Sequence, residues 1–162
     1  MPRPAADETR DAQALSQERS PGSAEADAVP PDPKRSQRLE SGRRFSIEAA
    51  RLCADRRCRN VRVLDVSGLS PICDYFVLAT GASERQMGTV ARDVEELADG
   101  FDLRPLQSTR RGEPNERWVA IDLVDVIVHV FSEEARLFYD LDNLWGDARE
   151  IHWSAGRELP SA

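Results

Sequence analysis

The stretch WVAIDLVDVIVHVF, residues 118–131, restricts the possible folds more than any other part of the sequence. It consists of two runs rich in β-branched and aromatic residues, and a Leu-Val step separates Asp122 from Asp125. Such runs favour strands, so we expect two strands, over 117–122 and 125–131, joined as a hairpin. Tight hairpin turns prefer residues that tolerate positive φ, such as Gly or Asn. Leu-Val fits this preference poorly, so we expect a wider or strained turn.

Three other segments have strand character. VRVLDVS, residues 61–67, alternates as a half-buried strand does. YFVLAT, residues 75–80, is apolar on both faces, as expected of a central strand that is covered on both sides. LRPLQS, residues 103–108, contains Pro105, which lacks a backbone donor and makes this segment a candidate edge strand.

Helical periodicity predicts three helices, over about 46–58, 83–99 and 132–145. Ser83 and Gln86 form a capping box at the start of the second helix. The third helix begins with two glutamates, which suit the helix dipole. Its apolar stripe is predicted to face the core and comprises Leu137, Phe138, Leu141, Leu144 and Trp145.

The element order α-β-β-α-β-β-β-α predicts an α/β (α+β) fold, with helices packed against a mixed sheet of about five strands. Residues 44–154 are expected to form the domain, which at roughly 110 residues can build one core. Residues 1–43 hold six of the ten prolines and few large apolar residues, so we expect a disordered tail. Residues 155–162 are expected to be flexible.

The net charge of −7 falls entirely on residues 45–162, because residues 1–44 contain equal numbers of acidic and basic residues. Nucleic-acid-binding domains are usually basic, so this acidic domain better suits a basic protein partner. The segment KRSQRLESGRR, residues 34–44, leaves direct RNA contact as a secondary alternative. No apolar run suffices for a membrane span and the N-terminus does not resemble a signal peptide, which indicates a cytoplasmic protein.

Several residue groups are candidates for chemistry. Asp122, Asp125 and His129 could form a metal or acid–base site, but their spacing does not specify a common cleft, and polar residues around a turn explain them better. TGASERQ, residues 80–86, has a single glycine, so a plain strand-to-helix turn is favoured over a phosphate site. The odd number of cysteines argues against a disulfide framework, and all are interpreted as structural thiols. We therefore predict no catalytic residue, metal or cofactor.

Large aromatic residues at the ends of the predicted elements suit a protein interface as well as they suit a core. Three blocks carry a more specific signal: DYFVLATGASERQ; Gly112 followed by five residues and then WVAID; and DVIVHVFSEEARLFYDLDNLW. In this order and spacing they resemble the ribosomal silencing factor family, also called Iojap-like or RsfS, over about residues 46–153.

The resemblance implies a nucleotidyltransferase-like fold without transferase activity, and usually a homodimer. It implies binding to large-subunit ribosomal protein fourteen on the face that meets the small subunit. Subunit joining is then blocked sterically, which represses translation under nutrient limitation. Organelle relatives assist large-subunit assembly, so an assembly factor is one alternative, and an active nucleotidyltransferase is another.

The resemblance also implies site residues. Positions expected to bind the ribosomal protein are Trp118, Asp122, Asp125, His129, Arg136, Tyr139, Leu144 and Trp145. Other positions that match the family blocks are Asp74, Tyr75, Ser83, Arg85 and Gln86. The family usually has glycine between the two acids, where this chain has Val124.

Overall fold

The computed structural model describes residues 30–108 and 117–156. The predictions for the first 29 residues, for the loop at 109–116 and for the last six residues lie outside this part. The elements, in order, are α1 (Pro33–Asp55), β1 (Arg59–Asp65), β2 (Tyr75–Thr80), α2 (Glu84–Gly100), β3 (Gln107–Ser108), β4 (Trp118–Asp122), β5 (Val126–Phe131), α3 (Glu133–Tyr139), α4 (Leu141–Leu144) and β6 (Arg149–Glu150).

The strands that the structure describes form one mixed sheet in the order β3-β4-β5-β2-β1-β6. Only β2 and β5 pair in parallel, and the other neighbours are antiparallel. The predicted α/β class, mixed sheet and β4–β5 hairpin are confirmed. The short strand β6 was not predicted, and the strand expected over 103–108 is reduced to the two residues of β3.

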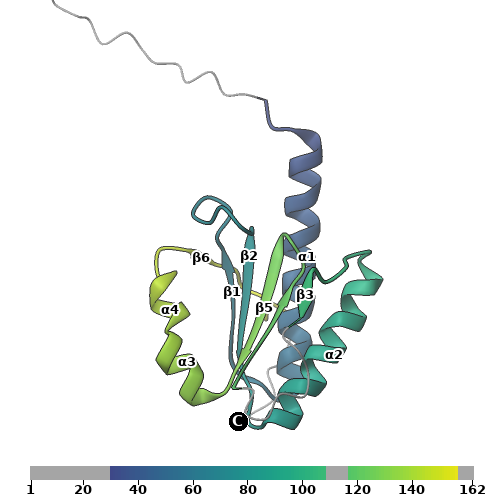
Figure 1. The fold of residues 1–162 in the computed structure, drawn as a ribbon. Helices are drawn as coiled ribbons and strands as arrows, with labels where there is room; N and C mark the ends of the chain where they lie inside the picture. The colour runs from purple at the N-terminus through teal and green to yellow at the C-terminus, as the bar shows by residue number, and fades with distance from the viewer. Residues whose placement is uncertain (1–29, 109–116, 157–162) are drawn as a thin grey trace, which may run out of the picture. The chain divides into compact units, whose positions relative to one another are not determined.

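Helices cover both faces of the sheet (Figure 1): α1 and α2 lie on one side, and α3 and α4 on the other. Side chains of a strand alternate between the faces, so Val77 and Val128 pack under α1 and α2. Phe76 and Phe131 pack in the second core under α3 and α4. None of the described helices has the length and apolarity to cross a membrane.

Helix α1 begins at Pro33, so the predicted start at residue 46 was wrong, and residues 33–43 are helical. Asp32 caps the helix by accepting from the Lys34 N–H at 3.0 Å, and proline suits the first helical position. Tertiary contacts hold this extension. Gly42 lies so close to Tyr75 that an added Cβ would be 3.2 Å from the ring.

The third predicted helix is interrupted at Asp140, which adopts the left-handed conformation with φ 48° and ψ 47°. The chain after Asp140 therefore turns away from the axis of α3. Leu141 still packs against the second core, but the side chains of Leu137 and Phe138 are 77% and 80% exposed. The prediction that one continuous stripe faces the core was wrong for these two residues and for Leu144.

The turn between β4 and β5 is strained at Val124, whose φ is +73°. The Asp125 N–H donates to the Leu123 carbonyl at 3.0 Å, which makes a γ-turn, a rare and strained turn when its central φ is positive. This conformation is sterically unfavourable for a β-branched residue, whereas glycine adopts it without strain. The poor fit of Leu-Val to a tight turn is thus confirmed.

Val124→Gly should raise the free energy of unfolding by about 1 kcal/mol. Glycine removes the strain of the left-handed conformation in the folded state, and this gain outweighs the greater conformational entropy that glycine gives to the unfolded chain. Val124 is 45% exposed, so little packing is lost. Urea denaturation measures the change, and Val124→Ala is the control because it keeps the Cβ. A destabilised glycine variant would contradict the strain argument.

Candidate protein-docking face

Trp118, at the start of β4, is the centre of an aromatic cluster on the α3–α4 side of the sheet. Its ring centroid lies 4.6 Å from that of Tyr139 on α3 and 5.2 Å from that of Phe131 on β5. Its indole N–H donates to His129 Nδ1 at 3.1 Å. This bond and the ring contacts fix the half-buried indole in one orientation, with Tyr139 beside it at the surface.

His129 supports this cluster from below. It is 6% exposed and lies between the rings of Phe76 and Trp118. Burial lowers its pKa from 6.5 to about 4, so the imidazole is neutral at pH 7. Because Nδ1 accepts the indole N–H, the proton sits on Nε2, which has no hydrogen-bond partner among the residues that the structure describes. His129 therefore holds the Trp118 ring in place and adds no charge to the aromatic cluster.

Acidification should reveal this buried neutral histidine. Between pH 6.5 and about 4 the unfolded state binds a proton that folded His129 does not. Lowering the pH through this window therefore decreases the free energy of unfolding, and His129 accounts for about 3 kcal/mol of the decrease. Denaturation of wild type and His129→Gln at several pH values isolates the contribution, because glutamine does not titrate. Parallel curves would show that the histidine is not held neutral.

Beside this cluster, α3 and α4 expose large apolar side chains to solvent. Their exposed fractions run from 48% at Tyr139 to 80% at Phe138. We call this set the α3–α4 apolar patch: Leu137, Phe138, Tyr139 and Leu144. Contiguous exposed apolar surface commonly marks an interaction site.

Arg136 explains why α3 turns its apolar residues outward. Its side chain is only 10% exposed, and the guanidinium group donates to both carboxylate oxygens of Asp142 at 2.9 Å. It also donates to the Asn60 carbonyl at 2.6 Å and to the buried Thr80 hydroxyl at 3.0 Å. The pKa of Asp142 is lowered, chiefly by the bond from Arg136. The inner side of α3 is therefore occupied by an ion pair, and Arg136 positions the patch.

Asp122 and Asp125 lie at the other end of the hairpin, four or more residues from Trp118 along the strands. Asp122 accepts the Val124 N–H at 3.0 Å, and Asp125 pairs with Arg38 of α1. The carbonyl of Asp125 accepts the N–H groups of Asp74 and Tyr75 at 2.9 and 3.0 Å. These acids organise the turn and fasten α1, and the structure does not bring them to His129.

In the described part of the chain, no group of three His, Cys, Asp or Glu residues could hold a metal ion. Trp145, another predicted docking residue, is half-buried, and its ring lies 5.3 Å from that of Phe76. It therefore supports α4 more than it extends the patch.

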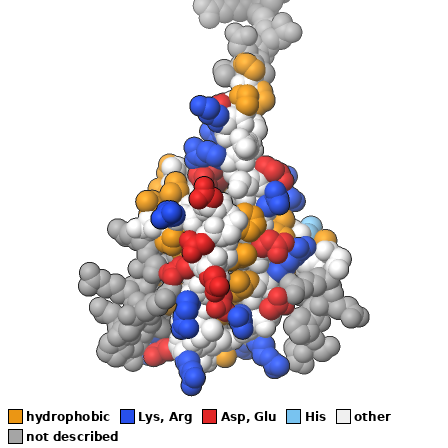
Figure 2. Space-filling view, turned by 90° about the vertical axis from the view of Figure 1, so that its right-hand side faces the viewer, with side chains coloured by type: hydrophobic (Ala, Val, Ile, Leu, Met, Phe, Trp, Pro, Cys, Tyr) orange, Lys and Arg blue, Asp and Glu red, His pale blue; other side chains and the backbone are white. Residues whose placement is uncertain are grey.

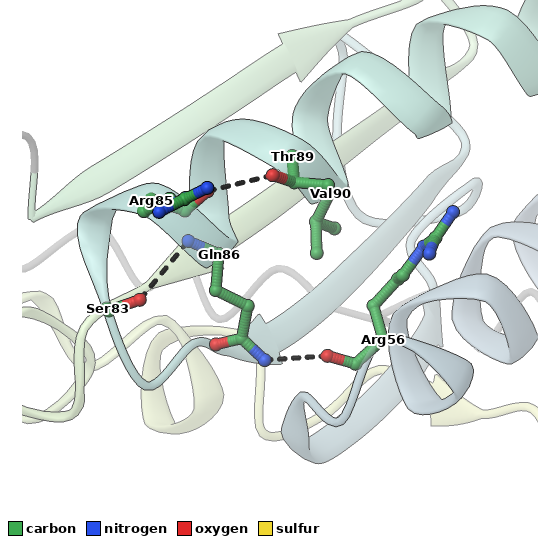
Figure 3. A pocket seen from close by; sticks show the side chains of 6 residues that line it. All are labelled: Arg56, Ser83, Arg85, Gln86, Thr89 and Val90. Carbon is green, nitrogen blue, oxygen red and sulfur yellow. Dashed lines mark hydrogen bonds between the residues drawn. The ribbon is translucent and has the colours of Figure 1, made fainter.

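The TGASERQ turn lines a shallow pocket at the start of α2 (Figure 3), but its polar groups make hydrogen bonds within the protein. The predicted cap is confirmed: the Gln86 N–H donates to Ser83 Oγ at 3.2 Å. The Gln86 side chain accepts from the Ala82 N–H and donates to the Arg56 carbonyl at 2.6 Å. Gly81 is explained by packing, because an added Cβ would lie 2.4 Å from Met87 Cγ. This arrangement favours a plain turn over a phosphate site.

Arg85, from the same family block, is exposed at this pocket, and its carbonyl accepts from the Thr89 hydroxyl at 3.0 Å. Sequence reasoning missed Leu137 and Phe138 as surface residues. The signal was the run LFY, because three consecutive large apolar residues point in directions about 100° apart on a helix and cannot all face one core.

A mixed sheet covered by helices on both faces, with an exposed apolar patch on one side, makes this an α/β protein with a candidate docking surface. The family follows from comparison with known proteins. Residues 40–161 match the family model described as ribosomal silencing factor during starvation, RsfS, and the chain belongs to this family.

Individual relatives agree. The ribosomal silencing factor RsfS of Bacillus subtilis strain 168 is 39% identical over 102 residues, which cover 62% of this chain and 83% of that protein. The chloroplastic protein Iojap of Arabidopsis thaliana is 28% identical over 109 residues, covering 66% of this chain and 44% of that protein. These relatives are named as silencing factor and Iojap proteins, not as enzymes.

Solved structures share the fold. A crystal structure from Chromobacterium violaceum has a TM-score of 0.56 at 28% identity and covers 76% of this chain and 96% of its own. One from Bacillus halodurans has a TM-score of 0.54 at 29% identity, covering 72% and 98%.

Proposed function

We propose that this chain binds the large ribosomal subunit through its protein fourteen and sterically blocks joining with the small subunit. Translation is thereby repressed under nutrient limitation, in the cytoplasm. The observation that carries the proposal is the α3–α4 apolar patch beside Trp118. A binding protein of this family needs a docking surface, and this patch combines exposed apolar area with a fixed aromatic neighbour.

Charge supports the same partner class. Glu133 and Glu134, at the start of α3, are exposed beside the patch, and the chain carries a net charge of −7. Ribosomal proteins are typically basic because they bind RNA phosphates. Opposite charges around an apolar centre speed encounter and orient docking.

The decisive experiment is co-sedimentation with purified large subunits at near-physiological salt, with and without small subunits. Silencing predicts binding that excludes small subunits. Binding without exclusion would favour the assembly-factor alternative. Absence of binding would contradict both roles and return attention to an enzymatic alternative, which calorimetry with a nucleotide and magnesium would test.

A homodimer is proposed for the free protein, with the apolar patch as the surface that would need cover. Light scattering during gel filtration measures the mass directly, and a concentration-independent monomer mass would contradict the dimer.

Direct RNA contact through residues 34–44 is a weaker candidate. These residues lie in α1, where Arg38 is paired with Asp125. Figure 2, which shows the α2 side of the molecule, has acidic and basic side chains interspersed. RNA binding would show a steep salt dependence that is lost when residues 1–44 are deleted.

A further inference from the structure

The α1–β1 junction brings two cysteines together. The Cys58 N–H donates to the Cys53 carbonyl at 2.9 Å, and the Arg57 N–H donates to the Ala54 carbonyl at 2.9 Å. Arg57 is left-handed, with φ 63°. These two bonds and the left-handed residue are the Schellman helix ending, which places the third-last helical residue against the second residue beyond the cap. That contact is usually between apolar side chains, and here both partners are thiols.

The two thiols are hydrogen-bonded to each other, and their environments differ. Cys53 is fully buried, and the bond to Cys58 together with burial raises its pKa. Cys58 is 9% exposed, and the bond from Cys53 lowers its pKa. Cys58 therefore has the only exposed fraction of the pair, a small one, and holds the thiolate more readily, while Cys53 remains a fully buried thiol. This is the division of roles between an attacking and a resolving cysteine.

Cys73 provides an internal reference. It is buried in the second core, on the opposite face of the sheet from Cys53 and Cys58. Burial raises its pKa to about 11, so it is protonated at neutral pH. Cys73 is therefore expected to resist oxidation and serves as a control cysteine within the same chain.

We propose that Cys53 and Cys58 form a peroxide-oxidisable dithiol, a modification site at the α1–β1 junction. The Cys58 thiolate attacks one oxygen of a hydroperoxide. The O–O bond breaks, the rest of the peroxide leaves as hydroxide or alkoxide and takes up a proton, and Cys58 becomes a sulfenic acid. The Cys53 sulfur then attacks the Cys58 sulfur. An S–S bond forms, the S–O bond breaks, and the oxygen leaves with the Cys53 proton as water. Two thiols lose two electrons, and the hydroperoxide gains them.

The test exposes the reduced full-length chain to hydrogen peroxide, alkylates the remaining thiols under denaturing conditions and locates the modifications by mass spectrometry. The expected product lacks two hydrogen atoms, carries a Cys53–Cys58 cross-link and keeps Cys73 alkylated. Treatment with dithiothreitol should restore three alkylatable cysteines. The proposal is overturned if all three stay alkylatable, if Cys73 enters the cross-link, or if Cys58 gains oxygen without a cross-link.

Variants separate the two roles. Cys73→Ala should form the cross-link at the wild-type rate. Cys58→Ala should leave Cys53 reduced, and Cys53→Ala should accumulate oxidised Cys58 as sulfenic or sulfinic acid. If a substitution in the buried pair prevents folding, the wild type and Cys73→Ala still decide the outcome, because a cross-link must appear in both. Oxidation of Cys53 in the Cys58→Ala variant would contradict the assigned roles.

Discussion

Replacing Phe138 by aspartate should weaken binding to the large ribosomal subunit by about a hundredfold, or about 2.7 kcal/mol. Phe138 is 80% exposed, so its removal leaves no cavity and the fold should persist. The new carboxylate would be buried without a partner when the α3–α4 apolar patch docks, which is costly. Co-sedimentation at several protein concentrations gives the affinity, and circular dichroism checks the fold.

Ile72→Asp is the matched control, because it places the same charge on a 68% exposed apolar residue in the β1–β2 connection. It should bind like the wild type. An equal loss in both variants would point to a general charge effect. Undiminished binding of Phe138→Asp would remove the patch from the docking surface and leave the proposed function without its main support.

Arg136→Met should lower the free energy of unfolding by about 2–3 kcal/mol, because the arginine side chain is buried and its partners lose a donor, while Asp142 keeps its ion pair with Arg62 at 2.7 Å. The change removes both bonds to Asp142 and leaves the Asn60 carbonyl and the Thr80 hydroxyl without this donor. Urea denaturation measures the loss. Arg136→Lys should recover only part of it, because an ammonium cannot reproduce the two-pronged contact.

Arg59→Met provides the comparison for this variant. Arg59 also pairs with a carboxylate of the α3–α4 region, Glu133, but both side chains are exposed, by 58% and 69%. Such pairs contribute little, so the change should stay within about 0.5 kcal/mol. Equal effects at Arg59 and Arg136 would show that Arg136 is a surface residue, available to a partner as the family resemblance implied.

The elements with strong local signals could be predicted from the sequence. β2 has the predicted bounds, and the capping box of α2 forms as expected. The first part of α1 could not be predicted, because residues 33–43 carry few apolar side chains. Their helix depends on contacts made far along the sequence, such as Gly42 against Tyr75 and Arg38 with Asp125.

The candidate site was predictable in its residue types but not in its geometry. Helical periodicity assumes a straight helix, and nothing local marked Asp140 as left-handed. Once the helix breaks there, Leu137 and Phe138 are free to face solvent. His129 was expected on the docking surface, and its position beneath Trp118 depends on the register in which β4 pairs with β5, which the sequence spacing alone does not reveal.

The parallel pairing of β2 with β5 has a consequence for the order in which the chain folds during synthesis. Tyr75 of β2 pairs with Val126 of β5. Because α2, β3 and β4 lie between these strands in the sequence, β2 is synthesised well before its second neighbour, β5. During that interval β2, which is buried on both faces in the finished protein, is an unpaired apolar edge. The growing chain is therefore most prone to aggregation before residue 131 leaves the ribosome, and chaperones that shield apolar edges should act on it then.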